Sequence, residues 1–333
     1  MNIKNLSNIL KDEPKFRFKQ VNKALFVDYI SDWQEVTVFP LALREKLESN
    51  CPLYINAKLV DSGDKKSTKA LISFSDNLSV ETVLIRQSDG RHTVCVSSQI
   101  GCPLACKFCV SGSIGFKRNL NYFEIVEQFL FWARYLKKED KKIDNLVFMG
   151  MGEPLLNYDE VLKAIKFLND EESFNFGARR ISISTVGLAK QIKRLAKEPF
   201  QVNLGISLHA YNDSLRKELM PKAVELNSLR EIMQAVDYYI FKTNRQVMFE
   251  YIMIDKVNDS LEIAKNLAVL MKRPLFMVNL IPCNSNENYN PSPKKTINDF
   301  AKVLSDKGVK VTIRESLGSD ISAACGQLAK IDN

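Results

Sequence analysis

Three cysteines, Cys102, Cys106 and Cys109, lie within eight consecutive positions of the chain. Three thiolates on one loop can hold one metal centre, but iron-sulfur clusters and structural zinc sites normally take four protein ligands. A four-iron cluster would leave one iron able to bind a small molecule. Zinc would need a fourth ligand from elsewhere, such as Cys95 or His209. Three unrelated buried thiols are the third alternative.

The composition narrows the class of protein. The 333 residues are 45% hydrophobic and 26% charged, with a formal net charge of +8. These values are typical of a globular protein with a sizeable core, and the basic excess suits a polyanionic partner such as nucleic acid. Because the sequence has no apolar run of membrane-spanning length and no signal-peptide pattern at its start, we expect a cytoplasmic protein whose cysteines serve metal or redox chemistry.

Helices and strands alternate after the third cysteine. Asn121 and Glu124 stand at capping-box spacing before an apolar stripe, so a helix is predicted to begin near Tyr122, and Asn157 with Glu160 predicts the cap of the next helix. The predicted buried strands are 144–149, 181–184, 202–208, 247–254, 276–281 and 309–313. Such a series of about six βα units closes into a full or partial parallel barrel, with functional residues at the carboxyl ends of its strands.

The chain divides into three predicted parts. Residues 1–52 have a helical pattern and are predicted to form a small N-terminal domain. Residues 53–94 contain short alternating runs typical of strands, with a hairpin turn at Asp89-Gly90. Residues 95–333 carry the barrel and a C-terminal segment. The predicted fold class is therefore α/β, a partial parallel (βα)6 barrel with a helical N-terminal domain and a short β extension.

Two groups of basic residues could meet a polyanion. Between Lys4 and Lys23, six basic residues face only two acidic ones. Lys107, Lys117 and Arg118 flank the cysteine loop. Each group is either an RNA-contacting surface or a solvated face of the protein.

The cysteine spacing, with Phe108 before the last cysteine, resembles the cluster loop of radical S-adenosylmethionine (SAM) enzymes. Further blocks, in the same order and nearly end to end, resemble the RlmN/Cfr family of RNA adenine methyltransferases. These blocks are 95–99, 112–119, 150–154, 207–209, 279–282 and 323–328. The resemblance implies a radical SAM barrel that holds a [4Fe-4S] cluster on Cys102, Cys106 and Cys109.

The reaction that the resemblance implies needs more than SAM and a base. An adenine carbon between two ring nitrogens is electron-poor and cannot attack the methyl group of SAM. The family is therefore expected to methylate a cysteine first, and to convert that methyl group to a carbon radical with a second SAM molecule, cleaved at the cluster. Cys325 matches the methyl-carrying position, and its thiolate can accept a methyl group by ordinary displacement.

Two further residues match the steps that follow. Cys95 matches the resolving cysteine, which attacks the sulfur of Cys325 and leaves a disulfide. Glu81 matches the base that removes the proton from the attacked carbon. The segment between Glu81 and Cys95 is about one residue longer than usual in the family, but the neighbours Val80 and Thr82 cannot act as bases.

The resemblance also implies which residues contact SAM. Gly152 and Glu153 match the contact to its methionine end, where a carboxylate pairs with an ammonium group. The other implied contacts, all at or just beyond predicted strand ends, are Ser184, Ser207, Leu208, His209 and Asn284. Cys51 and Cys283 have no family role and are predicted to be packed thiols.

The motifs around Gly152 and Ile281 look more like the RlmN branch, which methylates carbon 2, than the Cfr branch, which methylates carbon 8. The implied substrate is an adenosine in the peptidyl-transferase loop of 23S rRNA, with an anticodon-loop adenosine of some tRNAs as a second target. An electron donor such as flavodoxin is a further implied partner, and we expect a monomer without a membrane partner. Carbon-8 methylation, a radical enzyme for a small molecule, and a non-catalytic zinc-bound RNA-binding protein remain alternatives.

Overall fold

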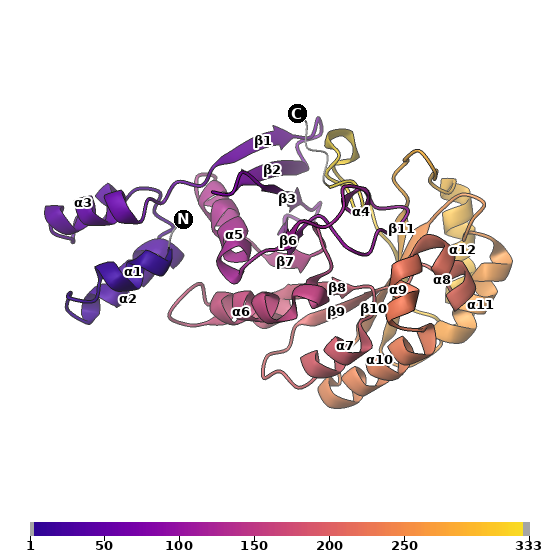
Figure 1. Cartoon of the computed structure of the whole chain (residues 1–333). Coiled ribbons are helices and arrows are strands. Elements are labelled where there is room, and N and C mark those ends of the chain that lie inside the picture. Colours follow the sequence, from indigo (N-terminus) through magenta and orange to yellow (C-terminus); the bar gives the residue numbers. More distant parts are fainter. Residues whose placement is uncertain (1–2, 329–333) are drawn as a thin grey trace.

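The computed structural model describes residues 3–328, and its core is a ten-stranded sheet in the order β1-β2-β3-β4-β7-β8-β9-β10-β11-β12 (Figure 1). The strands are β1 (Ala57–Asp61), β2 (Ser67–Ser73), β3 (Ser79–Arg86), β4 (His92–Cys95), β7 (Asn145–Phe148), β8 (Ile181–Thr185), β9 (Asn203–Ser207), β10 (Val247–Met253), β11 (Phe276–Pro282) and β12 (Val311–Ile313). From β1 to β4 the neighbours are antiparallel, and from β4 to β12 they are parallel. Two short strands, β5 (Gln99–Ile100) and β6 (Arg118–Asn119), pair separately.

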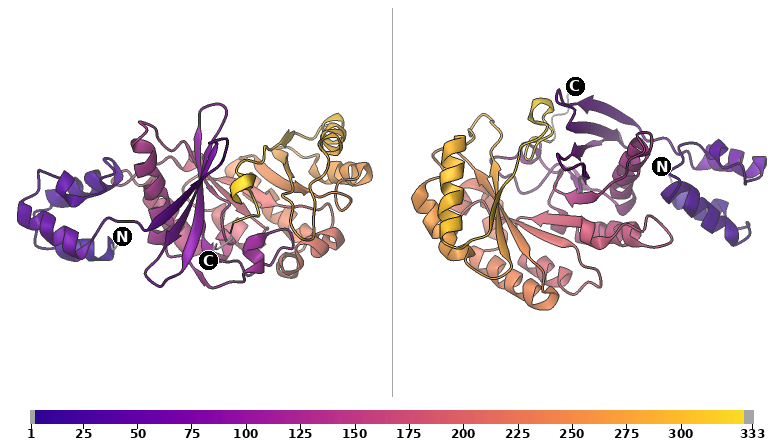
Figure 2. Two further views of the ribbon diagram at one scale, coloured as in Figure 1. Left: turned by 90° about the horizontal axis from the view of Figure 1, so that it is seen from above. Right: turned by 180° about the vertical axis from the view of Figure 1, so that it is seen from behind.

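The parallel part of the sheet is the predicted partial barrel. Its helices are α4 (Val110–Ser113), α5 (Tyr122–Lys137), α6 (Tyr158–Asn169), α7 (Ala189–Leu195), α8 (Asp213–Leu219), α9 (Pro221–Leu226), α10 (Leu229–Thr243), α11 (Leu261–Met271) and α12 (Lys294–Asp306). The long helices cover the outer face of the curved sheet (Figures 1 and 2). Because β1 and β12 stand at the two ends of the strand order, the sheet is open between them. The predicted α/β fold class is confirmed.

Alternation along the strands sorts apolar from polar side chains. In β8, Ile181 and Ile183 are fully buried in the hydrophobic core. Ser182 and Ser184, which point to the opposite face, line cavities inside the barrel. Because side chains alternate between the two faces of the strand, one set packs against the outer helices and the other places small polar groups inside the barrel.

The β extension continues the main sheet. Its last strand, β4, pairs antiparallel with β3 on one side and parallel with β7 on the other. The predicted hairpin turn between β3 and β4 is confirmed, with Gly90 at a φ of +85° and the amide of Gln87 donating to the carbonyl of Arg91.

The N-terminal helices have a hydrophobic cluster of their own. They are α1 (Ile3–Ile9), α2 (Phe16–Phe26) and α3 (Leu41–Asn50), with a short 3-10 turn at Trp33–Glu35. They lie at the opposite end of the molecule from α11 and α12 (Figures 1 and 2). Phe26 attaches them to the barrel, since its ring lies 5.1 Å from that of Phe167 and 4.9 Å from that of Phe174. None of the helices described in residues 3–328 is both long and apolar enough to cross a membrane.

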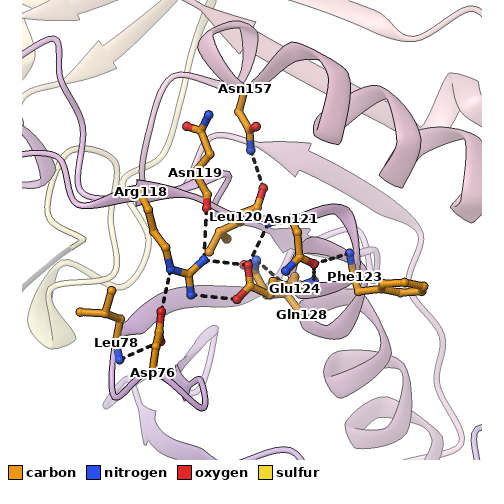
Figure 3. Close-up of polar contacts among 10 residues, drawn as sticks. All are labelled: Asp76, Leu78, Arg118, Asn119, Leu120, Asn121, Phe123, Glu124, Gln128 and Asn157. Atoms are coloured by element: carbon orange, nitrogen blue, oxygen red, sulfur yellow. Dashed lines mark hydrogen bonds and ion pairs between the residues drawn. The ribbon is translucent and has the colours of Figure 1, made fainter. Parts of the chain in front are cut away.

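The start of α5 carries the predicted capping box (Figure 3). Asn121 accepts from the amide of Glu124, and the Glu124 carboxylate accepts from the amide of Asn121. Arg118 donates to both oxygens of Glu124, at 2.8 and 2.9 Å, and to Asp76 at 2.7 Å. The hydrogen bond to Glu124 raises the pKa of Arg118. Its guanidinium therefore joins β6, α5 and the β2–β3 turn, whereas Lys117 is exposed.

The predicted cap of α6 is wrong. Asn157 stands at the N-terminus of this helix, but its side chain makes no capping hydrogen bond. Its amide instead donates to the carbonyls of Ser98 and Leu120, and Figure 3 shows the bond to Leu120. The Glu160 carboxylate accepts from the amide of Tyr122. These side chains satisfy backbone groups of neighbouring segments, which short-range spacing does not reveal.

Candidate active site

The three cysteines of the loop line one cavity of about 160 Å³ at the carboxyl ends of the parallel strands. We call it the cysteine cavity. It also contains most of the other predicted site residues: Gly152, Glu153, Ser184, Ser207, His209 and Cys325. This position is the edge of a parallel barrel where functional residues are expected.

Tight backbone geometry shapes the cysteine loop. Gly101, directly before Cys102, has a φ of +71°, and a Cβ there would lie 1.7 Å from the carbonyl oxygen of Gly115. At the other side of the loop, the amide of Lys107 donates to the carbonyl of Leu219 at the end of α8. The loop is therefore held against both its own continuation and the barrel.

The thiols of the loop are partly buried. Burial raises the pKa of Cys102 to about 12, and it raises the pKa of Cys109 as well. For Cys106, burial raises the pKa well above its usual value, and the neighbouring Cys109 and Cys102 act in the same direction. Without a metal these cysteines are neutral thiols at pH 7, and a bound cation would be needed to convert them to thiolate ligands.

The donor set fits a cluster better than a single ion. Within residues 3–328, no three His, Cys, Asp or Glu side chains converge on one point that could hold a metal ion. Zinc needs such convergence, whereas the cysteines of a four-iron cluster bind different iron atoms. Three thiols arranged around a shared cavity therefore suit the larger group.

His209 is unsuited to be a fourth zinc ligand. Its Nδ1 accepts a hydrogen bond from the amide of Ile252 at 3.0 Å, and burial lowers its pKa to about 3. The imidazole is therefore neutral with its proton on Nε2, so neither nitrogen offers a lone pair to a metal. The other candidate, Cys95, lines a different cavity.

Glu153 both binds backbone amides and faces the cysteine cavity. Its carboxylate accepts from the amides of Leu155 and Val186, at 2.9 and 2.8 Å, and it lines the cysteine cavity. Burial raises its pKa to about 7. A cationic ligand in the cavity would compensate this buried acid.

The C-terminal segment crosses the mouth of the barrel and carries Cys325 to the cysteine loop. The amide of Val110 donates to the carbonyl of Gly326, and the Ser111 hydroxyl donates to the carbonyl of Leu328, both at 2.7 Å. Asn284 donates from its amide to the carbonyl of Cys325 at 2.9 Å. Asn284, predicted to contact SAM, is thus placed against the C-terminal segment instead of among the residues that line the cysteine cavity.

A second cavity, of about 510 Å³, lies beside the first, and we call it the inner cavity. Cys95 and Cys325 both line it, and Cys325 also lines the cysteine cavity. Attraction to the Cys325 thiolate raises the pKa of Arg314, while burial raises the pKa of Cys95 to about 12. The structure therefore brings both cysteines of the predicted thiol chemistry to the inner cavity, near one guanidinium, and Cys325 alone also lines the cysteine cavity.

Glu81 lies on the same face of the sheet as Cys95. Cys95 pairs with Val83 across the strands, and Glu81 is two positions from Val83 in β3. Thr82 points to the other face, where it accepts from Trp132. Glu81 is buried in an ion pair with Lys69, 2.8 Å long, and it is not among the residues that line either cavity.

The remaining sequence predictions fall in buried positions. Leu208 is fully buried and is not among the residues that line either cavity. Cys51 is buried in the N-terminal cluster, and Cys283 is buried in a small apolar cluster that packs against the cysteine loop. As predicted, both are packed side chains.

Sequence reasoning missed Lys69, Glu250 and Arg314. Glu250 and Arg314 line both cavities, and Lys69 pairs with Glu81. The signal for Glu250 was a lone acid within an otherwise apolar strand, Val247–Met253. The other two carry no local signal, because strand pairing and the returning C-terminal segment bring them to the site.

Comparison with known proteins assigns the chain to a family. Residues 96–267 match the model of the radical SAM superfamily. The chain is 44% identical over 323 residues to a probable dual-specificity RNA methyltransferase RlmN from Carboxydothermus hydrogenoformans, covering 95% of this chain and 92% of that protein. It is 40% identical to the ribosomal RNA large subunit methyltransferase N of Nitrosopumilus maritimus, covering 94% and 92%.

A solved structure extends the likeness to the fold. The crystal structure of a radical SAM methyltransferase from Sphaerobacter thermophilus matches with a TM-score of 0.92 and 40% identity, covering 98% of this chain and 97% of that one. The fold and the cysteine loop thus define a radical SAM enzyme. Within that class, the chain belongs to the RlmN family of RNA methyltransferases. This membership implies SAM and a four-iron cluster as its cofactors.

The geometry of the cysteine loop leads to a test. We expect Gly101→Ala to displace the loop, because its Cβ would overlap the Gly115 carbonyl, and to lower the iron content after anaerobic reconstitution well below that of the wild type. Gly115→Ala is the matched control. Gly115 has a similar φ of +73° but no atom within 4 Å of its added Cβ, so we expect a loss of only about 1 kcal/mol in stability and normal iron. Equal iron in both variants would contradict this account.

Proposed function

We propose that this enzyme methylates carbon 2 of an adenosine in the peptidyl-transferase loop of 23S rRNA, and of an anticodon-loop adenosine in some tRNAs. The observation that carries the proposal is the position of Cys325, which lines both the cysteine cavity and the inner cavity. A methyl group on this sulfur would face SAM on one side and an RNA base on the other. This is what two-stage transfer through a cysteine requires.

The alternatives fit less well. A zinc-bound RNA-binding protein lacks a suitable fourth ligand in His209 or Cys95, and a radical enzyme for a small molecule leaves Cys95 and Cys325 without a purpose. Methylation of carbon 8 would use the same residues. The names of the two relatives described above favour the RlmN branch.

The proposed chemistry assigns separate roles to the two thiols. Cys325 takes a methyl group from the first SAM, with the Arg314 guanidinium lining the same two cavities. When bound on Cys102, Cys106 and Cys109, the cluster supplies the electron that cleaves the second SAM. After the methylene carbon has bonded to adenine, the adduct gives one electron to an oxidised carrier such as flavodoxin and one proton to Glu81. Cys95 then attacks the sulfur of Cys325, so that an S–S bond forms, the C–S bond breaks, and the released carbon takes up a proton to become the methyl group of the base. An electron donor such as flavodoxin would then reduce the enzyme.

Glu81 is the proposed base for the adduct. The face that it shares with Cys95 supports this role over Val80 or Thr82, whose side chains point away. The ion pair with Lys69 supplies a fixed cation beside the carboxylate. Because the positively charged adduct is far more acidic than adenine, a carboxylate is a sufficient base.

For SAM, we propose that Glu153 and Gly152 meet the methionine end, and that Ser184, Ser207 and His209 line the rest of its site. His209 would act as a neutral donor through Nε2–H. Leu208 would contribute backbone atoms, and Asn284 would hold the backbone at Cys325. We further propose a cytoplasmic monomer that consumes two SAM molecules per turnover.

The N-terminal domain, residues 1–52, is the proposed RNA-binding domain. Its helix α2 exposes two aromatic rings, Phe16 at 55% and Phe18 at 39%, beside the exposed Lys15 and Lys19. Exposed aromatics between basic residues can stack on unpaired bases while the cations meet phosphate.

The proposed function is tested by the modified nucleoside. Reconstituted enzyme is incubated without oxygen with SAM, reductant and unmodified 23S rRNA fragment, and the nucleosides are identified by mass and retention. We expect 2-methyladenosine with wild type and none with Cys325→Ala. The appearance of 8-methyladenosine would assign the enzyme to the Cfr branch, and activity without Cys325 would contradict the proposal.

The role of Cys95 predicts a trapped intermediate. Cys95→Ala should stop at a covalent protein–RNA adduct, seen as a shifted band that ribonuclease digestion removes, whereas Cys283→Ala should turn over normally. Because burial raises the pKa of Cys95 to about 12, its thiolate fraction increases about tenfold per pH unit below that value. In single turnover, release of RNA by wild type should therefore accelerate with pH between 7 and 9. A rate that falls with pH would exclude Cys95 as the attacking thiol.

If the N-terminal domain binds RNA, charge reversal in this domain should lower RNA affinity more than charge reversal elsewhere. Reversing three exposed lysines of the N-terminal domain, Lys11→Glu, Lys15→Glu and Lys19→Glu together, should weaken binding of the 23S rRNA fragment about tenfold or more and reduce its salt dependence. The matched control reverses three exposed lysines at the opposite end of the molecule, Lys265, Lys272 and Lys302. Equal losses from the two sets would mean that net charge, and not this domain, determines binding.

A further inference from the structure

Glu250 is a buried carboxylate with one unused oxygen. It lies in β10, is 3% exposed, and accepts from the Asn279 amide through Oε2 at 2.8 Å. Its Oε1 is buried and has no hydrogen-bond partner among residues 3–328. Glu250 lines both the cysteine cavity and the inner cavity. A buried acceptor without a partner is costly, so this oxygen is available for a ligand that fills the cavity.

The register of the strands places Glu250 in a polar row across the barrel. Its direct neighbours are Ser207 in β9 and Asn279 in β11. The Ser207 hydroxyl lies 3.3 Å from that of Ser184 in β8. Both serines line the cysteine cavity and are proposed to contact SAM. Glu250 is therefore the next side chain of the same row, and the only acid among these four.

A carboxylate at this place limits which group of SAM could bind Glu250. Burial raises the pKa of Glu250, and Arg314 and the Asn279 amide act against this rise. The Asn279 amide already donates to Oε2, and an unprotonated Oε1 can only accept a hydrogen bond. SAM offers three kinds of donor: the ammonium group, the ribose hydroxyls and the adenine amine. Glu153 takes the ammonium in the proposed site, and it stands on a different element of the cavity wall, after β7.

The position of Cys325 selects among the remaining donors. Cys325 and Glu250 are both among the residues that line the two cavities together. The carbon of SAM that must reach a methyl group on Cys325 is C5′, which is attached directly to the ribose. A ribose held at Glu250 would bring C5′ to the same boundary, whereas an adenine amine held there would point the ribose away from it.

We propose that Oε1 of Glu250 accepts a hydrogen bond from a ribose hydroxyl of SAM and so directs C5′ toward Cys325. The proposal deepens the proposed function, because the place for C5′ depends on the role of Cys325. The transfer itself balances within this geometry: a C–H bond of the Cys325 methyl group breaks and a C–H bond at C5′ forms. Glu250 takes no part in either bond and acts as a positioning residue.

The test measures binding before any turnover. Cluster-loaded enzyme without reductant or RNA is titrated by equilibrium dialysis with SAM and with its 2′-deoxy and 3′-deoxy analogues. We expect one analogue to bind wild type about tenfold or more weakly than SAM, as a hydrogen bond to a charged group predicts. Glu250→Ala should bind SAM with a similar loss and should no longer distinguish that analogue from SAM.

A matched control and a second readout separate this role from a general effect of the cavity. Glu315 also lines the inner cavity but is exposed, so Glu315→Gln should keep full discrimination. With reductant and RNA, Glu250→Ala should release more 5′-deoxyadenosine per methylated base than wild type, because a misplaced C5′ is consumed without transfer. If Glu250→Ala fails to load iron, Glu250→Met, which fills a similar volume without an oxygen acceptor, replaces it, and the wild-type comparison of analogues remains decisive.

Two results would overturn the proposal. One is equal binding of SAM and both analogues by wild type, and the other is undiminished discrimination in an iron-loaded Glu250 variant. Failure of the proposed function has a different signature. A protein that distinguishes the analogues through Glu250 but makes no 2-methyladenosine would retain this ribose contact and lose the assigned RNA reaction.

Discussion

The site depends on the hydrogen bonds that fix the C-terminal segment across the mouth of the barrel. The backbone around Cys325 is held by Val110 and Ser111 from the cysteine loop side and by Asn284 from the strand side. On the far side of the segment, Asp320 accepts from the amide of Gly63 in the β extension. These contacts join regions that are distant in sequence, so the thiol at position 325 is placed by the whole fold.

The open barrel provides two adjoining spaces that such a thiol can connect. One is lined by the three loop cysteines and the serines of β8 and β9, and the other by Cys95 and the inward faces of the strands. Separate spaces suit a reaction in which SAM and an RNA base must meet the same sulfur from different sides. Burial raises the pKa of the loop thiols and keeps them neutral until a bound cation favours the thiolate.

Much of this arrangement was predictable because it is encoded locally. The cysteine spacing predicted the loop, and the alternation of helices and strands along the chain predicted the barrel. Asn121 and Glu124 predicted the start of α5. What sequence could not reveal is decided by long-range pairing. Asn157 holds the backbone of Ser98 and Leu120 instead of capping its helix, and Arg118 joins three segments. Glu250 stands out in the sequence as a lone acid in an apolar strand, but only the strand register shows that it lies beside Ser207.

The central claim is that Cys325 carries the methyl group between SAM and RNA. The most direct test is to incubate the cluster-loaded enzyme with SAM bearing a trideuterated methyl group and reductant, digest it, and locate the label by peptide mass spectrometry. The account predicts a label on the peptide that contains Cys325 and none on the peptides that contain Cys95 or Cys283. A label on another cysteine, or methylated RNA from enzyme whose Cys325 never carries it, would contradict the account.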